Sequence, residues 1–269
     1  MQENNAHYYD YADLNLLLDV CWEAGDLAMK YFGCELDVRF KDGNSPVSEA
    51  DVAIDVFLKE KLLGARPNYG WISEETEDNR GEAIYKRYFV VDPIDGTRGF
   101  LSGSIEWCIS VAIIENSRPV VGVLQCPAKD EIYAAITGEG ATLNGVRLPL
   151  LRSNINRKYR VSIDQLIAQK LPYDFSNRIS FFRYIPSLAY RIVLVAQGEI
   201  DIVLVQPNCH DWDIAAADLI LQECGGCFMP LEAPFISYGI GAYQDGFLVA
   251  GESNCCQNMI NVVRQAKLV

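Results

Sequence analysis

Apolar positions recur at steps of three and four residues in two stretches near the start of the chain. One stretch covers residues 10–32 and is followed by Gly33, and the other covers residues 48–63 and begins at Ser48, a favourable N-cap. This spacing predicts two helices that each bury one face. Short apolar runs bounded by turn residues come next and predict strands at residues 71–72, 88–91, 109–114, 120–124 and 131–135.

The second half of the chain alternates between the two kinds of pattern. The spacing predicts three helices and two buried strands, with helices at residues 188–197, 211–224 and 253–267 and strands at 200–205 and 247–250. Such alternation is typical of an α/β layer, whereas helices followed by a run of strands favour an α+β arrangement. We therefore expect an α+β half over residues 1–150 and an α/β half over residues 151–269, packed together around one shared site.

The charge balance of the chain narrows the classes of function. The 269 residues are 50% hydrophobic and include 36 acidic and 23 basic residues, which gives a formal net charge of −13. The hydrophobic content excludes an intrinsically disordered chain. The acidic excess argues against a nucleic-acid partner, because affinity for the phosphate backbone comes mainly from Lys and Arg. The acidic side chains therefore either solvate the surface or gather to hold cations.

The sequence gives no sign of export or of a membrane partner. Residues Met1–Asn5 lack a basic segment followed by an apolar one, so no signal peptide is recognised. No apolar run approaches the roughly 18 residues that a membrane-spanning helix needs. Nine cysteines, an odd number, fit a reducing compartment better than a disulfide framework. We expect a cytoplasmic protein.

Cys224 and Cys227 form a Cys-x-x-Cys motif. It closes the predicted helix 211–224, and Gly225 and Gly226 act as stop signals. A redox motif of this kind normally opens a helix, where the helix dipole stabilises the thiolate. No second Cys-x-x-Cys completes a zinc site. We expect both thiols to be buried or incidental, and the sequence assigns them no role.

Acidic residues recur at the ends of predicted strands and at the starts of predicted helices. These residues are Asp51, Glu74 and Glu75, Asp92 and Asp95, and Asp213. Solvation alone does not require carboxylates at such positions. The alternative reading of the pair Asp92 and Asp95, taken by itself, is an Asp-Pro turn on the surface.

The segment around Asp92 carries the most information. A hydrophobic strand delivers Asp92, and Pro93 is expected to fix a turn that brings Asp95 beside it. Two carboxylates so close repel each other unless a cation lies between them. Gly96 and Thr97 then offer backbone N–H groups suited to an oxyanion or a phosphate. Hard oxygen ligands next to an anion cradle indicate magnesium and metal-assisted phosphate chemistry.

Other motif classes do not match the spacing. Phosphatases of the haloacid dehalogenase type separate their two aspartates by one residue, and here two residues intervene. The alternating oxygen ligands of an EF-hand are absent. The sequence contains neither a P-loop nor the Gly-x-Ser-x-Gly segment of a serine hydrolase.

These segments together resemble the inositol monophosphatase family of magnesium-dependent, lithium-sensitive phosphatases, over roughly residues 10 to 265. Asp92–Thr97 looks like the first family signature, and Trp212–Ala216 with Glu223, Gly225 and Gly226 looks like the second. Ser73–Glu75, Lys41, Ser45–Val47 and Asp51 match upstream segments of the family. The resemblance implies a layered αβαβα sandwich and a homodimer.

The resemblance also implies two or three Mg²⁺ ions in each site. Glu74, Asp92 and the carbonyl of Ile94 would hold the first ion, and a third, weaker ion would lie near Glu74 with Asp51 close by. The second ion would be held by Asp92, Asp95 and Asp213. This ligand set would support hydrolysis by a metal-activated water without a covalent phosphoenzyme.

The remaining roles concern the attacking water and the phosphate. By resemblance, Thr97 and Glu74 would position and deprotonate the attacking water. The N–H groups of Gly96 and Thr97 would bind the phosphate, and Asp213 would also contact substrate.

The substrate side departs from the inositol-specific branch. The segment before the second signature, residues 205–210, contains no Glu to contact substrate hydroxyls. Ser187 and Arg191 resemble a serine-plus-basic pattern of branches that act on nucleotide bisphosphates or histidinol phosphate. Arg191 would either bind a second phosphate or be an ordinary exposed helix residue.

The expected function is therefore hydrolysis of a small phosphorylated metabolite. Inositol monophosphate, 3′-phosphoadenosine 5′-phosphate and histidinol phosphate all stay open as substrates. A different class also stays open, a non-catalytic binding partner of the RNA or transcription machinery, although the filled set of metal-ligand positions favours an enzyme.

Overall fold

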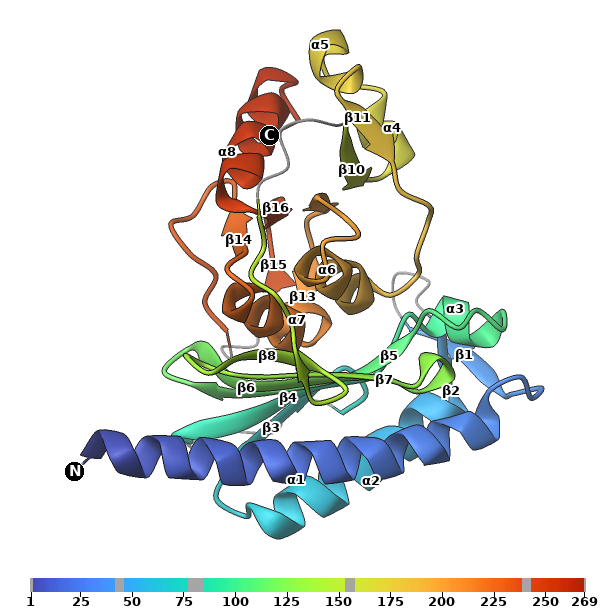
Figure 1. The fold of residues 1–269 in the computed structure, drawn as a ribbon. Helices are drawn as coiled ribbons and strands as arrows, with labels where there is room; N and C mark the ends of the chain where they lie inside the picture. Colours follow the sequence, from blue (N-terminus) through green and yellow to red (C-terminus); the bar gives the residue numbers. More distant parts are fainter. Residues whose placement is uncertain (1, 42–45, 77–84, 153–157, 239–242, 269) are drawn as a thin grey trace.

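Helical and sheet layers alternate through the molecule. The computed structural model describes residues 2–41, 46–76, 85–152, 158–238 and 243–268, and side chains from Tyr9 onward. The expected match at Ser45 lies outside these residues. From bottom to top, Figure 1 shows α1 and α2, a large sheet, α6 and α7, a smaller sheet, and an outer layer with α8. This order confirms the layered αβαβα sandwich.

The large sheet has seven strands in chain order, β3 to β9. They are β3 (Gly70–Ser73), β4 (Arg87–Asp95), β5 (Cys108–Glu115), β6 (Arg118–Cys126), β7 (Glu131–Ile136), β8 (Gly140–Leu143) and β9 (Val146–Arg147). The β3–β4 pair is parallel and the other pairs are antiparallel. Helices α1 (Gln2–Tyr31) and α2 (Glu49–Ala65) cover its lower face.

The smaller sheet has the strand order β11-β10-β12-β16-β14. Its strands are β10 (Tyr159–Ser162), β11 (Ile179–Phe181), β12 (Ile202–Val205), β14 (Cys227–Pro230) and β16 (Leu248–Gly251). The middle helices are α6 (Leu188–Ala196) and α7 (Asp211–Glu223), and the outer layer contains α4 (Gln165–Ala168), α5 (Tyr173–Ser176) and α8 (Ser253–Gln265). The short elements that remain are β1 (Val38–Phe40), β2 (Pro46–Ser48), α3 (Thr97–Leu101), η1 (Pro127–Lys129), β13 (Cys209–His210) and β15 (Tyr243–Gln244).

Successive residues of the central strands belong to different hydrophobic cores. Phe89 and Val91 pack with α1 and α2 below the large sheet, whereas Val90 packs with α6 and α7 above it. Because both faces of the sheet are covered, its central strands read as continuous apolar runs rather than as alternating ones. The upper core also includes residues of the smaller sheet, such as Val203 and Ala250.

The sequence predicted the long elements, with different ends. The first helix begins at Gln2 instead of residue 10, and the strand predicted at 200–205 begins at Ile202. The amide of Asp201 instead donates to the carbonyl of Arg160. The boundary expected near residue 150 falls between β9 and β10, and the division into two halves stays a prediction.

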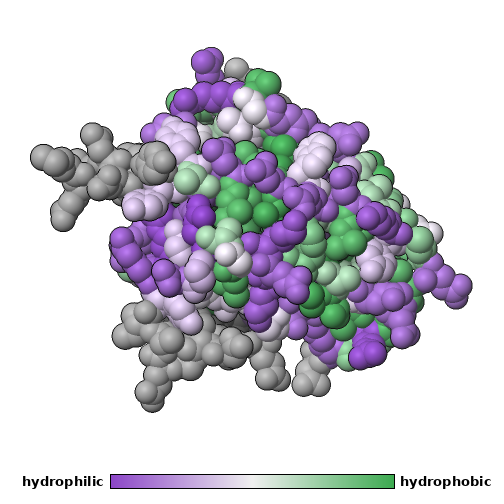
Figure 2. Space-filling model, turned by 90° about the horizontal axis from the view of Figure 1, so that it is seen from below, coloured by the Kyte–Doolittle hydropathy of each residue, from purple (hydrophilic) through white to green (hydrophobic). Residues whose placement is uncertain are grey.

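The outer surface of α1 and α2 mixes polar and apolar side chains. Figure 2, which views this face from below, shows hydrophilic and hydrophobic residues interspersed over it. Trp22, Met29, Val52 and Val56 are among its exposed apolar residues. Within the described residues, no helix combines the length and the apolar character needed to cross a membrane.

Helix α7 lies close to the large sheet because small residues line the contact. A Cβ atom added to Gly122 on β6 would lie 3.1 Å from both the Cα atom and the carbonyl oxygen of Ala216. Because a methyl group has no rotamer that would move it away from these backbone atoms, the close contact could be relieved only by a shift of the backbone. The absence of a side chain at Gly122 therefore allows α7, the helix that carries Asp213, to pack this close to the sheet.

We predict that Gly122→Ala lowers the free energy of unfolding by about 1–3 kcal/mol, because the added methyl group forces α7 away from the sheet. Urea unfolding monitored by circular dichroism measures the change. Gly64→Ala is the matched control, since Gly64 lies in α2 with open space around it and should gain up to about 1 kcal/mol of helix stability. Equal effects of the two substitutions would contradict this packing argument.

Candidate metal centre

Three carboxylates from distant parts of the chain meet in one group. Asp92 and Asp95 come from the end of β4, and Asp213 comes from the first turn of α7. One oxygen of each lies within 4.8 Å of the others. Asp92 and Asp95 are only 2% and 6% exposed. The group is thus a buried acidic cluster and not a solvated surface turn.

A break in strand register places Asp92 and Asp95 together. Residues three apart on a regular strand point to opposite faces. The expected Pro93 turn is not found, because β4 continues to Asp95 and its pairing with β5 shifts between Asp92 and Asp95. The extra residue in this bulge turns both carboxylates toward the same side. The amide of Ile94 donates to Asp92 Oδ1 at 2.9 Å and fixes that side chain.

Asp213 is fixed by the start of its helix. The backbone N–H of His210, the N-cap residue of α7, donates to Asp213 Oδ2 at 2.7 Å. The ring of His210 stacks on that of Trp212 with centroids 4.4 Å apart. The N-terminal turn of a helix is also where backbone dipoles favour a carboxylate.

The electrostatics of the cluster favour a bound cation. Burial, followed by the nearby charges of Glu74 and Asp95, raises the pKa of Asp92 well above its ordinary value. Burial and the Asp95 charge do the same to the pKa of Asp213. A divalent cation would supply the missing positive charge, and the hard carboxylate oxygens suit Mg²⁺. The residues present therefore fit the metal that the sequence indicates.

Ser187 lies behind the cluster rather than in an open site. It is fully buried, and its hydroxyl donates to Asp95 Oδ2. The same carboxylate oxygen accepts the amide of Ala189 at 2.7 Å, and Oδ1 accepts the amide of Leu188 at 3.3 Å. Burial raises the pKa of Asp95, and these donors oppose the shift. Ser187 therefore helps to position Asp95, and the substrate contact expected of it from sequence stays a prediction.

Asp51 and Thr97 form a hydrogen-bonded pair next to the cluster. Asp51 completes the capping box of α2 with Ser48, whose amide donates to Asp51 Oδ2 at 2.7 Å. Its other oxygen accepts the Thr97 hydroxyl at 3.1 Å, and that hydroxyl also lies 3.1 Å from the carbonyl of Ile94. The role predicted from sequence for Thr97 and Glu74, positioning and deprotonating the attacking water, stays a prediction, and the structure adds Asp51 as the hydrogen-bond partner of Thr97.

Glu74 lies at the edge of the cluster and is bound to Lys41. The Lys41 Nζ atom lies 3.3 Å from Glu74 Oε1 and 2.6 Å from Glu75 Oε1. Within the described part of the chain, Glu74 is outside the group of three carboxylates that meet within 4.8 Å. Its charge nevertheless contributes to the raised pKa of Asp92 and of Asp213. Burial raises the pKa of Glu75 to about 7, although Lys41 opposes the shift.

Gly96 links the bulge of β4 to helix α3. Its φ of +94° lies in the left-handed region, and an added Cβ would lie 3.0 Å from the amide nitrogen of Ser187. Glycine is therefore required at this position, both for the positive φ and for the close approach of Ser187. Among the turn, loop and cap hydrogen bonds of the described residues, neither Gly96 nor Thr97 donates its amide. Within the described part of the chain, these two N–H groups are therefore available to an anion.

A large cavity of about 1240 Å³ adjoins the cluster. Leu188, whose amide is bound to Asp95, and Cys209, which precedes the N-cap of α7, both line it. Its wall also includes Phe181, Arg183 and Arg191. Pockets for small ligands typically measure about 300–1,000 Å³, so this one exceeds what a single sugar-sized phosphate would fill.

Arg191 offers a cation to this cavity. It is half-buried and is not the exposed helix residue that the sequence left open as an alternative. Its Nε donates to the carbonyl of Ser187 at 3.3 Å, and no ion pair of the described residues includes it. Burial lowers its pKa, and the Asp95 charge opposes that shift.

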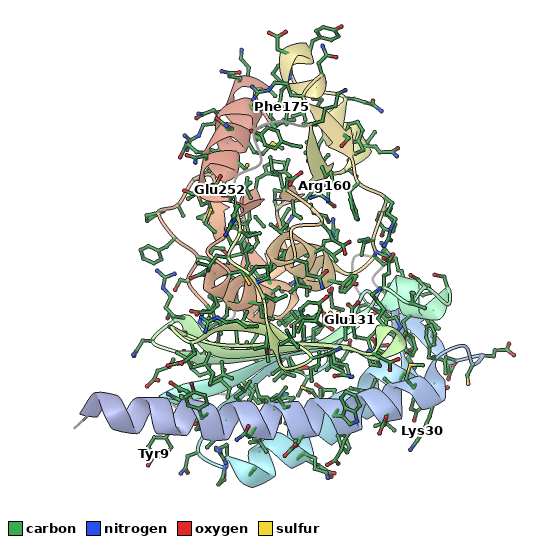
Figure 3. The ribbon with its side chains drawn as sticks, in the orientation of Figure 1. Tyr9, Lys30, Glu131, Arg160, Phe175 and Glu252 are labelled. Carbon is green, nitrogen blue, oxygen red and sulfur yellow. The ribbon has the colours of Figure 1, made fainter. Side chains whose placement is uncertain are left out.

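The neighbouring residue Tyr190 anchors α6 by donating to Glu131 Oε2 at 3.0 Å, and Figure 3 shows Glu131 near this helix.

The sequence analysis missed Asp55, which supports the strand that leads to Glu74. Its carboxylate accepts the hydroxyls of Ser73 and Thr76. Asp55 is 4% exposed and lies one helical turn from Asp51. A second carboxylate on the apolar face of the predicted helix 48–63 was the signal that could have identified it.

Protons and a cation compete for the cluster, and this predicts an unusual pH dependence of stability. Because the folded pKa of Asp92 and of Asp213 is raised, their contribution to stability is present in acid and is lost as pH rises above 3.8 through the folded value. In EDTA, we expect the Tm difference between wild type and Asp213→Asn to shift in favour of the variant as pH rises. Mg²⁺ should raise the Tm of wild type more at high pH than at low pH. A difference independent of pH would contradict the electrostatic account.

Comparison with known proteins indicates the same family as the sequence motifs do. Residues 13–261 match the sequence profile of the inositol monophosphatase family. The 3′(2′),5′-bisphosphate nucleotidase CysQ of Haemophilus influenzae is 28% identical over 79% of this chain and 82% of its own length. The inositol-1-monophosphatase of Rhizobium meliloti is 29% identical over 94% of this chain and 96% of its own length.

A solved structure shares the whole fold. The extragenic suppressor protein suhB from Bartonella henselae superposes with a TM-score of 0.83 at 26% identity, over 94% of this chain and 99% of the other. The family match extends over most of the chain and includes all three residues of the acidic cluster. The chain belongs to the inositol monophosphatase family of phosphatases.

Proposed function

We propose that this protein is a Mg²⁺-dependent phosphomonoesterase whose substrate carries a second anionic group, with a 3′(2′),5′-bisphosphate nucleotide as the best fit. The observation that carries the proposal is the group of Asp92, Asp95 and Asp213 beside a cavity that contains Arg191. The carboxylates would hold the metal, and the guanidinium would bind the second anion.

Each residue around the cluster would have its own role in hydrolysis. Asp51 holds the Thr97 hydroxyl by accepting a hydrogen bond from it, so the lone pairs of Thr97 are free to accept a hydrogen bond from a water and orient it. The amides of Gly96 and Thr97 would bind the phosphate oxygens. Bound Mg²⁺ would supply Lewis-acid stabilisation of the phosphate charge and would acidify water.

The residues that line the cavity favour the bisphosphate over the two other substrates considered. Inositol monophosphate and histidinol phosphate each carry one phosphate, and neither supplies a second phosphate for Arg191. Residues 205–210 offer no Glu to bind inositol hydroxyls. The aromatic residues Phe181 and Tyr184 in the cavity wall suit the face of a base. The relative named as a bisphosphate nucleotidase supports this choice, and the one named as an inositol-1-monophosphatase keeps that substrate in the test.

We predict that Asp95→Asn and Asp213→Asn each lower Mg²⁺-dependent release of inorganic phosphate by about a hundredfold or more, because each removes a carboxylate ligand from the metal ion that stabilises the developing charge. Phosphate release is measured over a Mg²⁺ titration. Asp19→Asn is the matched control, since Asp19 is exposed on α1 and should leave turnover unchanged. Full turnover in either cluster variant would refute the proposed metal site.

Substrate choice is tested separately at Arg191. We expect Arg191→Ala to lower kcat/KM for 3′-phosphoadenosine 5′-phosphate about tenfold to a hundredfold, because a charge-assisted hydrogen bond to phosphate is lost. The kcat/KM for inositol monophosphate should change much less, and Arg191→Lys should restore part of the difference. An unchanged ratio between the two substrates would remove the bisphosphate assignment while leaving the phosphatase assignment in place.

A further inference from the structure

Two cysteines far apart in the sequence meet between the smaller sheet and α8. Cys227 begins β14, and Cys256 lies in the first turn and a half of α8, which follows β16 directly. Strands β14 and β16 pair so that Cys227 lies opposite Gly251. Helix α8 then starts just after Glu252, its N-cap, which Figure 3 labels at the base of the helix. The topology therefore carries Cys256 back over Cys227.

Specific contacts hold both sulfur atoms around the Gly251 peptide. Cys227 Sγ lies 3.5 Å from the carbonyl oxygen of Gly251. Cys256 Sγ lies 3.7 Å from the carbonyl oxygen of Cys227 and 3.6 Å from that of Val249. A Cβ atom on residue 251 would come within 3.2 Å of Cys256 Sγ, so the glycine leaves room for the sulfur.

The two thiols also differ in a way that suits an ordered reaction. Cys227 is partly exposed, whereas Cys256 is fully buried. Each thiol affects the other: the nearby Cys256 side chain lowers the pKa of Cys227, and the Cys227 side chain together with burial raises the pKa of Cys256. Cys227 is therefore the thiol that an oxidant reaches and that ionises more easily.

The Cys-x-x-Cys motif does not supply this pair. Cys224 is the C-cap residue of α7 and is fully buried. Its carbonyl accepts the amide of Leu151, and the groups that affect its pKa are Glu223 and Arg147 rather than Cys227. The partner of Cys227 thus comes from α8 and not from its own motif.

We propose that Cys227 and Cys256 are a reversible oxidation site that forms a disulfide between β14 and α8 when the protein meets a hydroperoxide. The Cys227 thiolate attacks the peroxide oxygen, which gives a sulfenic acid and releases an alkoxide that takes up a proton. The Cys256 sulfur then attacks the Cys227 sulfur and displaces hydroxide, which leaves as water. One peroxide is reduced and two thiols are oxidised, and a dithiol reductant reverses the change.

The test is a thiol map of the full-length chain. Reduced protein is treated with a small excess of hydrogen peroxide near neutral pH, alkylated, and digested without reduction for mass spectrometry. We expect a linked peptide that joins Cys227 to Cys256, and its loss after dithiothreitol. Recovery of both cysteines in alkylated form under conditions that oxidise the exposed Cys34 would overturn the proposal, as would a link between Cys227 and Cys224.

Variants test the order of the two steps. Cys256→Ser should leave Cys227 as a sulfenic acid that dimedone labels, because the resolving thiol is gone. Cys227→Ser should leave Cys256 unmodified, and Cys34→Ser should form the linked peptide as wild type does. Equal dimedone labelling of Cys227 in wild type and Cys256→Ser would show that Cys256 does not resolve the sulfenic acid and would overturn the proposal. The wild-type map does not depend on the folding of any variant.

Discussion

The repulsion among three carboxylates, two of them buried and the third half-buried, is the constraint on which the rest of the site depends. Asp92, Asp95 and Asp213 come from a strand bulge and from the start of a helix in the other half of the chain. Nothing in the apolar core favours their approach, and burial raises the pKa of each. Neighbouring residues stabilise this arrangement. Donors from the start of α6 hold Asp95, and Gly122 sets the depth of the helix that carries Asp213.

The layered fold explains how these groups stay in place. The large sheet is buried on both faces, so the bulge in β4 has packed layers on either side and cannot relax into a regular strand. Helix α6 joins the carboxylate cluster to the cavity, since its first turn binds Asp95 and its next residues include Arg191. One helix therefore connects the proposed metal centre to the residue proposed to select the substrate.

Sequence patterns identified the long helices, the central strands and the acidic positions, because each leaves a periodic or local signal. They did not identify the bulge, since Pro93 is equally typical of a turn, nor the partner of Thr97, since Asp51 lies 46 positions earlier. The pairing of Cys227 with Cys256 depends on the order of strands in the smaller sheet, which no local pattern encodes. Short elements such as α4, α5 and β11 were also missed, because three or four residues show no period.

We expect the three carboxylates to bind a divalent cation in the geometry that the structure shows. Crystals soaked in Mn²⁺ as a substitute for Mg²⁺, with diffraction collected at the manganese absorption edge, test it directly. We expect an anomalous peak among the oxygens of Asp92, Asp95 and Asp213. A protein that takes up Mn²⁺ only elsewhere, with no peak in this group, would contradict it.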